Sequence, residues 1–132
     1  MVVAVGRLRP PFADDVAHYA KLLSGQTALD LIEVREDERV ERRIPDRAFV
    51  SLLHERGQAL DSVALSRFLE DRRMSGRDLC FVVGGPYGTA LDRCDLRLSL
   101  GPMTLPHQLA RVVLLEQLYR AHKILAGEPY HY

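Results

Sequence analysis

Residues Leu79–Gly88 read Leu-Cys-Phe-Val-Val-Gly-Gly-Pro-Tyr-Gly, an apolar stretch that runs directly into a glycine-rich loop. Five consecutive apolar residues, Leu79–Val83, predict a strand covered on both faces, as in a parallel sheet packed between helices. A loop of this kind can hold a polar ligand with its backbone N–H groups, or it can simply be a tight turn between strand and helix. Its glycine order is neither the dinucleotide fingerprint nor a P-loop.

Outward from this strand, short apolar runs alternate with stretches of helical periodicity. We expect strands at Val2–Val5, Leu29–Val34, Ala48–Leu53, Leu79–Val83 and Leu96–Leu100, with His54-Glu55-Arg56-Gly57 ending the third. We expect helices from Pro10-Pro11 to Ser24, from an N-cap at Ser62 to Met74, over Thr89–Asp95, and from Pro106 to Leu125. The alternation predicts one α/β domain, residues 1–132, with a mainly parallel sheet covered by helices.

The final helix has two apolar stripes, with Arg111, Glu116, Arg120 and Lys123 on the rest of its circumference. The stripes are Leu114, Leu118, Ala121, Leu125 and Val112, Leu115, Tyr119. One sheet face needs a single stripe, so the second predicts a partner subunit and hence a homodimer.

The segment Arg35–Arg47 carries five arginines and five acids around Pro45. Such a composition is typical of a solvated, mobile connection, and it would also suit a loop that reaches toward an RNA partner.

Composition limits the function classes. The formal net charge is zero, which argues against avid, nonspecific nucleic-acid binding but leaves room for local arginines. Cys80 and Cys94 have neither metal-ligand spacing nor a disulfide framework, so we expect reduced thiols and no metal. Met1 opens directly into a strand, and no apolar run approaches a membrane span. We therefore expect a soluble, cytoplasmic protein that does not bind a membrane.

Ligands of open parallel sheets bind at the carboxyl ends of the strands. The loops after Leu53, Val83 and Leu100 are expected to converge there. Two other candidates for a functional role, His107 and the pair Glu116 and Arg120, could also be purely structural. His107 follows the helix-starting proline and could be a capping or packing residue, and Glu116 with Arg120 could be an ordinary surface pair. The chain closes on Pro129-Tyr130-His131-Tyr132, an unusually aromatic terminus that could anchor on the last helix or serve a site.

The sequence resembles the RlmH family of knotted, SPOUT-class methyltransferases nearly end to end. The similarity is carried by Val2-Val3-Ala4-Val5-Gly6, Leu53-His54-Glu55-Arg56-Gly57 with Ser62, Phe81–Gly88, Met103-Thr104-Leu105-Pro106-His107, Arg111-Val112, Glu116–Ala121 and Pro129-Tyr130-His131. His54 stands where the family usually has an acid. The segment Arg35–Arg47 and the interval from the Gly-Gly loop to Thr104 look shorter than in the family, and Tyr132 stands where relatives often carry a basic residue.

The resemblance implies a C-terminal trefoil knot, a homodimer, and S-adenosylmethionine as methyl donor. The implied reaction is methylation of N3 of a pseudouridine in 23S ribosomal RNA of the assembled ribosome. Carried across by position, the cofactor residues are Leu53, Gly84, Leu100, Gly101, Pro102, Met103, Thr104 and Leu105. His107, Arg120, Tyr130 and His131 would line the substrate side. Two alternatives remain at this point: a knotted methyltransferase for another RNA such as tRNA, and a ribosome-associated dimer that binds the cofactor without activity.

Overall fold

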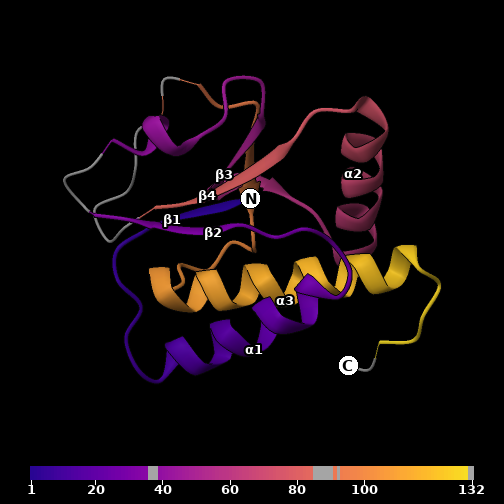
Figure 1. The fold of residues 1–132 in the computed structure, drawn as a ribbon, viewed down its shortest axis with the longest axis horizontal. Coiled ribbons are helices and arrows are strands. Elements are labelled where there is room, and N and C mark those ends of the chain that lie inside the picture. Colours follow the sequence, from indigo (N-terminus) through magenta and orange to yellow (C-terminus); the bar gives the residue numbers. More distant parts are fainter. Residues whose placement is uncertain (36–38, 85–90, 92, 131–132) are drawn as a thin grey trace.

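The computed structural model describes all residues except 36–38, 85–90, 92 and 131–132. In this described part, a parallel sheet runs in the order β2-β1-β4-β3-β5 (Figure 1). Its strands are β1 (Val2–Val5), β2 (Leu31–Val34), β3 (Phe49–Ala59), β4 (Leu79–Val83) and β5 (Leu96–Ser99). The helices are α1 (Phe12–Ser24), α2 (Ser62–Ser75) and α3 (His107–Leu125), with a 3₁₀ turn η1 (Val40–Arg43). The predicted α/β class with a parallel sheet is confirmed.

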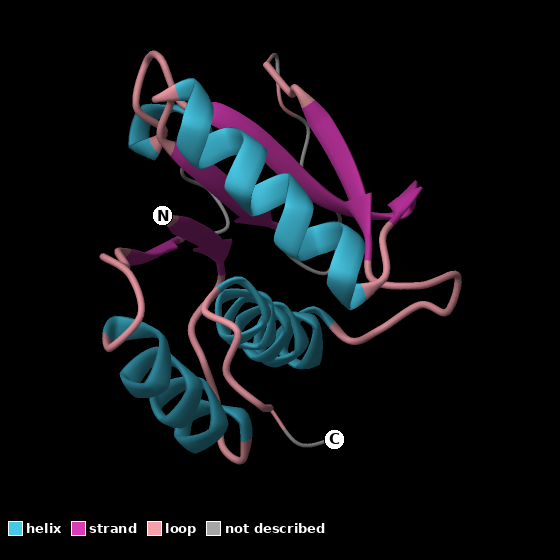
Figure 2. Cartoon of the chain, turned by 90° about the vertical axis from the view of Figure 1, so that its right-hand side faces the viewer, coloured by secondary structure: helices cyan, strands magenta, loops and turns pink. Residues whose placement is uncertain are grey.

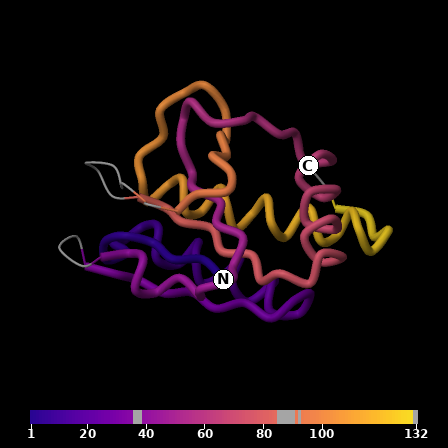
Figure 3. The backbone as a smooth tube through the Cα atoms, turned by 90° about the horizontal axis from the view of Figure 1, so that it is seen from above, coloured from indigo at the N-terminus to yellow at the C-terminus, as the bar shows by residue number. Residues whose placement is uncertain are grey.

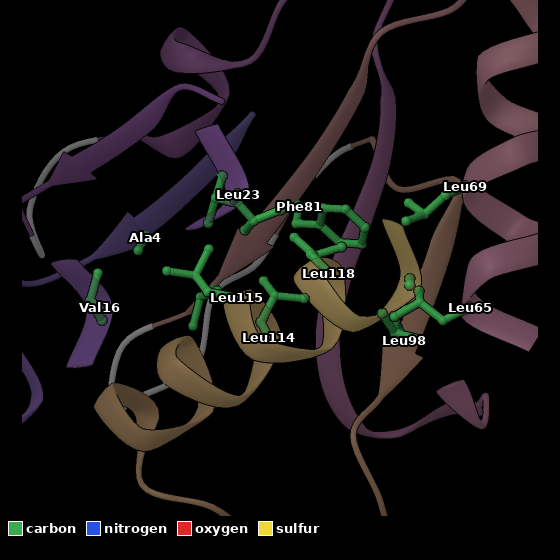
Figure 4. Close-up of a cluster of buried hydrophobic side chains, with 13 residues drawn as sticks. Ala4, Val16, Leu23, Leu65, Leu69, Phe81, Leu98, Leu114, Leu115 and Leu118 are labelled. Carbon is green, nitrogen blue, oxygen red and sulfur yellow. The ribbon is translucent and has the colours of Figure 1, made fainter. Parts of the chain in front are cut away.

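Alternate residues of the central strands enter two separate cores, as the two-residue period of a strand requires. Val2 and Ala4 of β1 join a cluster with α1, α2 and α3, whereas Val3 and Val5 join a cluster on the opposite face. Figure 1 shows α1 and α3 side by side beneath the sheet, and Figure 4 shows the side chains of this helix-covered core. From above, α3 runs almost the full length of the molecule and passes beside α2 (Figure 3). The helices therefore lie mainly against one face.

The second face of the sheet is closed by the segment between β2 and β3. Val40 of η1 and Ile44 are buried at 5% and 7% exposure and pack on strand residues such as Val50 and Val82. The interpretation of Arg35–Arg47 as a fully solvated connection is therefore wrong for its two apolar side chains, which the run of charges around them concealed. The arginines described in this segment are exposed.

Strand β3 is longer than predicted. It does not end at Leu53 but continues to Ala59, and its register with β5 shifts between Leu53 and Gln58. The backbones come unusually close here, because a Cβ atom added to Gly57 would lie 2.5 Å from the carbonyl oxygen of Arg97. The polar residues His54–Gly57 look like a loop in the sequence. In the structure they are the irregular part of β3, between Leu53 and Gln58, and have no partner in the register with β5.

Most helix limits agree with the sequence. The N-cap of α2 and the predicted helix Thr89–Asp95 differ. The N-cap of α2 is Asp61, whose carboxylate accepts a hydrogen bond from the backbone N–H of Ala64 at 2.7 Å, so the assignment of the cap to Ser62 is wrong. Ser62 instead donates to the side chain of Gln117 on α3 at 2.6 Å. In the predicted helix Thr89–Asp95, the described residues Leu91 and 93–95 are not helical, and the others lie outside the described residues.

Helix α3 packs against α1, α2 and the sheet. It lies between α1 and α2 (Figure 2), and its residues Leu114, Leu115, Leu118 and Ala121 are buried. Of the other stripe residues, Val112 and Tyr119 are only partly buried and Leu125 is 40% exposed. One chain therefore covers the stripes only in part, and the homodimer stays a prediction. Arg111, expected on the polar side, is 2% exposed.

The trefoil knot also stays a prediction, since residues 85–90 lie outside the described part. No helix in the described part is long and apolar enough to cross a membrane.

Candidate active site

Three neighbouring strands bring the predicted cofactor residues together, Gly84 and Leu100 directly after β4 and β5, and Leu53 where β3 leaves its regular register. Leu52 of β3 pairs with Val82 of β4, so Leu53 and Gly84 lie at the same end of adjacent strands. Leu53 also pairs with Leu98 of β5, two residues before Leu100. The predicted convergence of Leu53, Gly84 and the start of the Leu100–Leu105 loop at one sheet edge is thus observed.

The Leu100–Leu105 loop is held by the end of β3. The hydroxyl of Ser99 donates to the carbonyl oxygen of Glu55 at 3.1 Å and accepts from the backbone N–H of Gly101 at 3.0 Å. The hydroxyl of Thr104 donates to the Glu55 carboxylate. Gly101 has φ +136, a conformation that favours glycine, and the position of its absent side chain is open space. Met103 is 79% exposed. The loop therefore has a fixed base and an open, partly apolar surface.

A cavity of about 290 Å³ opens beside this loop. It is lined by Leu60, Asp61, Ser62, Leu65, Leu98, Ser99, Leu100, Val113 and Gln117. Its size is at the lower end of the usual range for small-molecule sites. Of the predicted cofactor residues, only Leu100 lines this cavity. The fit to S-adenosylmethionine therefore depends on the loop itself, where Gly101 leaves open space and Leu100 offers an apolar contact.

His107 lies near the same edge of the sheet. A Cβ atom added to Gly6, directly after β1, would be 3.9 Å from Nε2 of His107. Strand β1 neighbours β4, which ends directly before Gly84, so the imidazole lies one strand away from Gly84. The next residue fixes the helix start, because the Gln108 side chain accepts from the backbone N–H of Arg9 and donates to the carbonyl oxygen of Arg7, each at 2.9 Å.

Arg120 and Tyr130 form a second group on α3. The Glu116 carboxylate accepts from Arg120 at 3.0 and 2.5 Å and from the Tyr130 hydroxyl at 3.4 Å. The Arg120 guanidinium lies 4.3 Å from the centre of the Tyr130 ring, and Tyr119 meets the same ring edge-on. The chain reaches this position by turning back at Gly127, where φ is +69. The aromatic tail therefore packs on its own helix as far as Tyr130; His131 lies outside the described residues.

This arrangement fixes two protonation states. Burial raises the pKa of Tyr130, and the nearby Glu116 carboxylate raises it further. The hydrogen bond to Glu116 raises the pKa of Arg120. At neutral pH Tyr130 is therefore a hydrogen-bond donor and Arg120 a cation, and neither can accept a proton.

The two groups of predicted substrate residues are far apart in one chain. Helix α3 starts at the carboxyl edge, where Arg111 donates to the carbonyl oxygens of Val5 and Gly6. It ends at the amino edge, where Leu125 lines a cavity with Met1. From His107 to Arg120 the helix rises about 20 Å at ~1.5 Å per residue. One copy therefore does not bring Arg120 and Tyr130 to the cofactor edge.

Three charged residues near the predicted cofactor and substrate residues have roles that the sequence did not indicate. Glu116 holds Arg120 and Tyr130 together, although its spacing to Arg120 suggested only a surface pair. Glu55 positions the cofactor loop, and no spacing signal connects it with Thr104. Arg111 joins α3 to Glu33 of β2 at 2.8 Å and to the end of β1. The described residues contain no cluster of three or more histidine, cysteine or acidic side chains that could hold a metal ion.

Comparison with known proteins assigns this arrangement to a class. Residues 1–131 match the model of the family described as "Predicted SPOUT methyltransferase". A parallel sheet with Gly84 directly after β4 and a loop between β5 and the last helix is consistent with that class.

The more particular relationship comes from individual relatives. Ribosomal RNA large subunit methyltransferase H of Gluconacetobacter diazotrophicus is 44% identical, over 98% of this chain and 95% of the relative. The proteins of the same name from Bordetella petrii and Carboxydothermus hydrogenoformans are 41% and 37% identical, over 99% and 98% of this chain and 97% of each relative. The chain belongs to the SPOUT methyltransferases and, within them, to the ribosomal RNA large subunit methyltransferase H family.

This chain is shorter than those relatives. The three alignments extend over 146, 151 and 154 positions, whereas the chain has 132 residues. The relatives therefore carry residues that this chain lacks, as the short segments expected from the sequence suggested.

Proposed function

We propose that the protein transfers a methyl group from S-adenosylmethionine to N3 of a pseudouridine in 23S ribosomal RNA of the assembled ribosome, in the cytoplasm. The observation that carries the proposal is the convergence of Leu53, Gly84 and Leu100–Leu105 at the carboxyl edge of adjacent strands. Family membership supports the reaction class, and the names of the relatives support the large-subunit RNA as substrate.

When bound, S-adenosylmethionine supplies a methyl group on a sulfonium sulfur, so that the N3–CH₃ bond forms as the S–CH₃ bond breaks, the N3 proton passes to a base, and the sulfur is left neutral. The protein's part is mainly alignment and handling of that proton. Leu53, Gly84 and Leu100–Leu105 would hold the cofactor, with Glu55 fixing the loop through Thr104. Arg120 and Tyr130 supply a positive charge and a hydroxyl donor that can orient the base. The histidines His107 and His131 remain the proposed residues for accepting the N3 proton.

The separation along α3 supports a homodimer with composite sites. If two copies pair so that Arg120, Tyr130 and His131 of the partner subunit face the cofactor edge of the first copy, the distance of about 20 Å along the helix is no obstacle. The cofactor and His107 would then come from one chain and the tail from the other.

Mixing two inactive variants tests this composite site. Gly84→Val would disable the cofactor edge, and deletion of Tyr130–Tyr132 would disable the tail. After subunit exchange, half of the dimers would be mixed, and each mixed dimer would hold one intact site out of two, giving about a quarter of the wild-type rate. If both halves of the site came from the same chain, the mixture would stay inactive.

Mass spectrometry of the 23S ribosomal RNA fragment from a deletion strain tests the reaction itself. We expect the loss of one methyl group from a pseudouridine, restored by the wild-type gene. An unchanged fragment would contradict the proposal and would favour another RNA, such as tRNA, or a dimer that binds the cofactor without activity.

A further inference from the structure

The carboxylate of Glu116 is held at both of its oxygens, and only one of them faces Arg120 and Tyr130. Oε1 accepts from Arg120 at 3.0 and 2.5 Å and from the Tyr130 hydroxyl at 3.4 Å. Oε2 accepts from the side-chain amide of Gln117 at 2.7 Å. The last torsion of a glutamate side chain is broad, so contacts on one oxygen alone leave the carboxylate free to turn. The amide of Gln117 removes that freedom.

Gln117 is itself anchored from the start of α2, which passes beside α3 (Figure 3). Its Oε1 atom accepts from the hydroxyl of Ser62, the first residue of α2, at 2.6 Å. The charge of Glu116 fixes the direction of both bonds, because an ionised carboxylate can only accept. Gln117 must therefore turn its NH₂ group to Glu116 and its carbonyl oxygen to Ser62. A directed chain of hydrogen bonds thus runs from Ser62 through Gln117 to Glu116.

Packing alone does not hold the Gln117 side chain in this position. Gln117 and Ser62 both line the cavity of about 290 Å³, so the amide has open space on that side. Glu116 and Arg120, in contrast, are largely shielded from water, with side chains 17% and 20% exposed. Hydrogen bonds in such a shielded place are stronger than in water. The orientation of Gln117 therefore depends on its two hydrogen bonds.

We propose that Gln117 is a positioning residue for methyl transfer, which fixes the Glu116 carboxylate and, through it, the placement of Arg120 and Tyr130. This inference rests on the proposed function, in which Arg120 and Tyr130 orient the base. Gln117 carries no charge and contacts neither of these two residues in the hydrogen bonds given above; it acts only through Glu116. Displacement of an aligned group by a fraction of an ångström lowers the rate of a reaction that depends on alignment.

A double-mutant cycle on the rate of ribosome methylation separates positioning from a merely structural role. Gln117→Met keeps the length of the side chain and removes both hydrogen bonds. It should lower the rate about tenfold while the affinity for S-adenosylmethionine changes less than about twofold. In the background of Glu116→Ala, the same substitution should lower the rate by less than about a further twofold, because the group that Gln117 holds is gone. Equal losses in both backgrounds would overturn the proposal.

The ring signal of Tyr130 gives a second readout that needs neither cofactor nor ribosomes. It is recorded by NMR on the free protein with ¹³C-labelled tyrosine and assigned with Tyr130→Phe. Gln117→Met should shift this signal, and so should Ser62→Ala, which removes only the outer hydrogen bond and remains informative if Gln117→Met does not fold. Ser66→Ala is the matched control, because the hydroxyl of Ser66 bonds within α2, to the carbonyl oxygen of Val63 at 2.6 Å, and its loss should leave the signal in place.

The two readouts distinguish failure of this inference from failure of the proposed function. An unmoved Tyr130 signal in both Gln117→Met and Ser62→Ala, or a wild-type rate for a folded Gln117→Met protein, would overturn the positioning role. Absence of methyl transfer by the wild type would refute the proposed function instead, and the Tyr130 signal would still decide whether Gln117 positions this tyrosine.

Discussion

Gly57→Ala is the substitution that tests the unusual pairing of β3 with β5. The added Cβ atom would lie 2.5 Å from the carbonyl oxygen of Arg97, whereas ordinary contacts begin at 3.4 Å. The two backbones must therefore separate by about 0.9 Å, because neither contacting atom belongs to a flexible side chain. Overpacking of this kind typically costs about 1–3 kcal/mol.

For a chain of 132 residues, that loss corresponds to a fall in the melting temperature of about 4–11 °C, at ~2.1 cal/mol/K per residue. The cofactor loop begins directly after β5, so S-adenosylmethionine should also bind more weakly. Differential scanning calorimetry and titration calorimetry measure the two effects. Gly25→Ala is the control, because its Cβ atom would meet only an ordinary 3.5 Å contact and should cause no loss of stability. An unchanged melting temperature for Gly57→Ala would refute the close approach of the strands.

Three further substitutions test other parts of the site and the core. Gly84→Val should abolish cofactor binding in a folded protein, because a branched side chain would occupy the space where the protein backbone is proposed to approach the cofactor closely. Unchanged affinity by calorimetry would remove Gly84 from the site. Deletion of Tyr130–Tyr132 should reduce methylation of ribosomes at least about tenfold while leaving cofactor binding nearly intact, since Tyr130 packs at the surface of α3; a normal rate would show that the tail only packs. Burial and the charge of Arg73 lower the pKa of His122, so its neutral form favours the folded state. Stability should therefore fall as the pH drops below about 6.5, and His122→Gln should flatten that decline in thermal unfolding; identical profiles would contradict this role.

The parts of the fold that the sequence predicts correctly are those with a local signal. Leu79–Val83 and Val2–Val5 form strands because every residue is apolar, and the ends of α3 follow from Pro106 and Gly127. The second half of β3 gives no such signal, since it is largely polar and pairs with β5 only at Gln58 and Ala59, after an irregular stretch. Val40 and Ile44 were likewise hidden by the charged residues around them. These features depend on contacts between distant segments.

The candidate site, too, has parts that the sequence predicts and parts that depend on contacts between distant segments. Sheet geometry alone places Leu53, Gly84 and Leu100 together, and the structure has them at neighbouring positions, although β3 does not end at Leu53. The contact between Glu116 and Tyr130 could not be predicted, because it depends on the reversal of the chain at Gly127. The sequence predicts Arg111 on the polar side of α3. The residue is buried instead, because its ion pair with Glu33 links segments far apart in the sequence.

The proposed reaction is tested most directly by incubating the purified protein with methyl-labelled S-adenosylmethionine and assembled ribosomes from the deletion strain. The 23S ribosomal RNA is then digested, and the labelled nucleoside is identified by mass spectrometry. The account predicts about one labelled methyl group per ribosome, on N3 of a pseudouridine, and none when Gly84→Val replaces the wild type. Label on a different nucleoside, label in tRNA only, or no transfer to ribosomes that the wild-type strain methylates would contradict it.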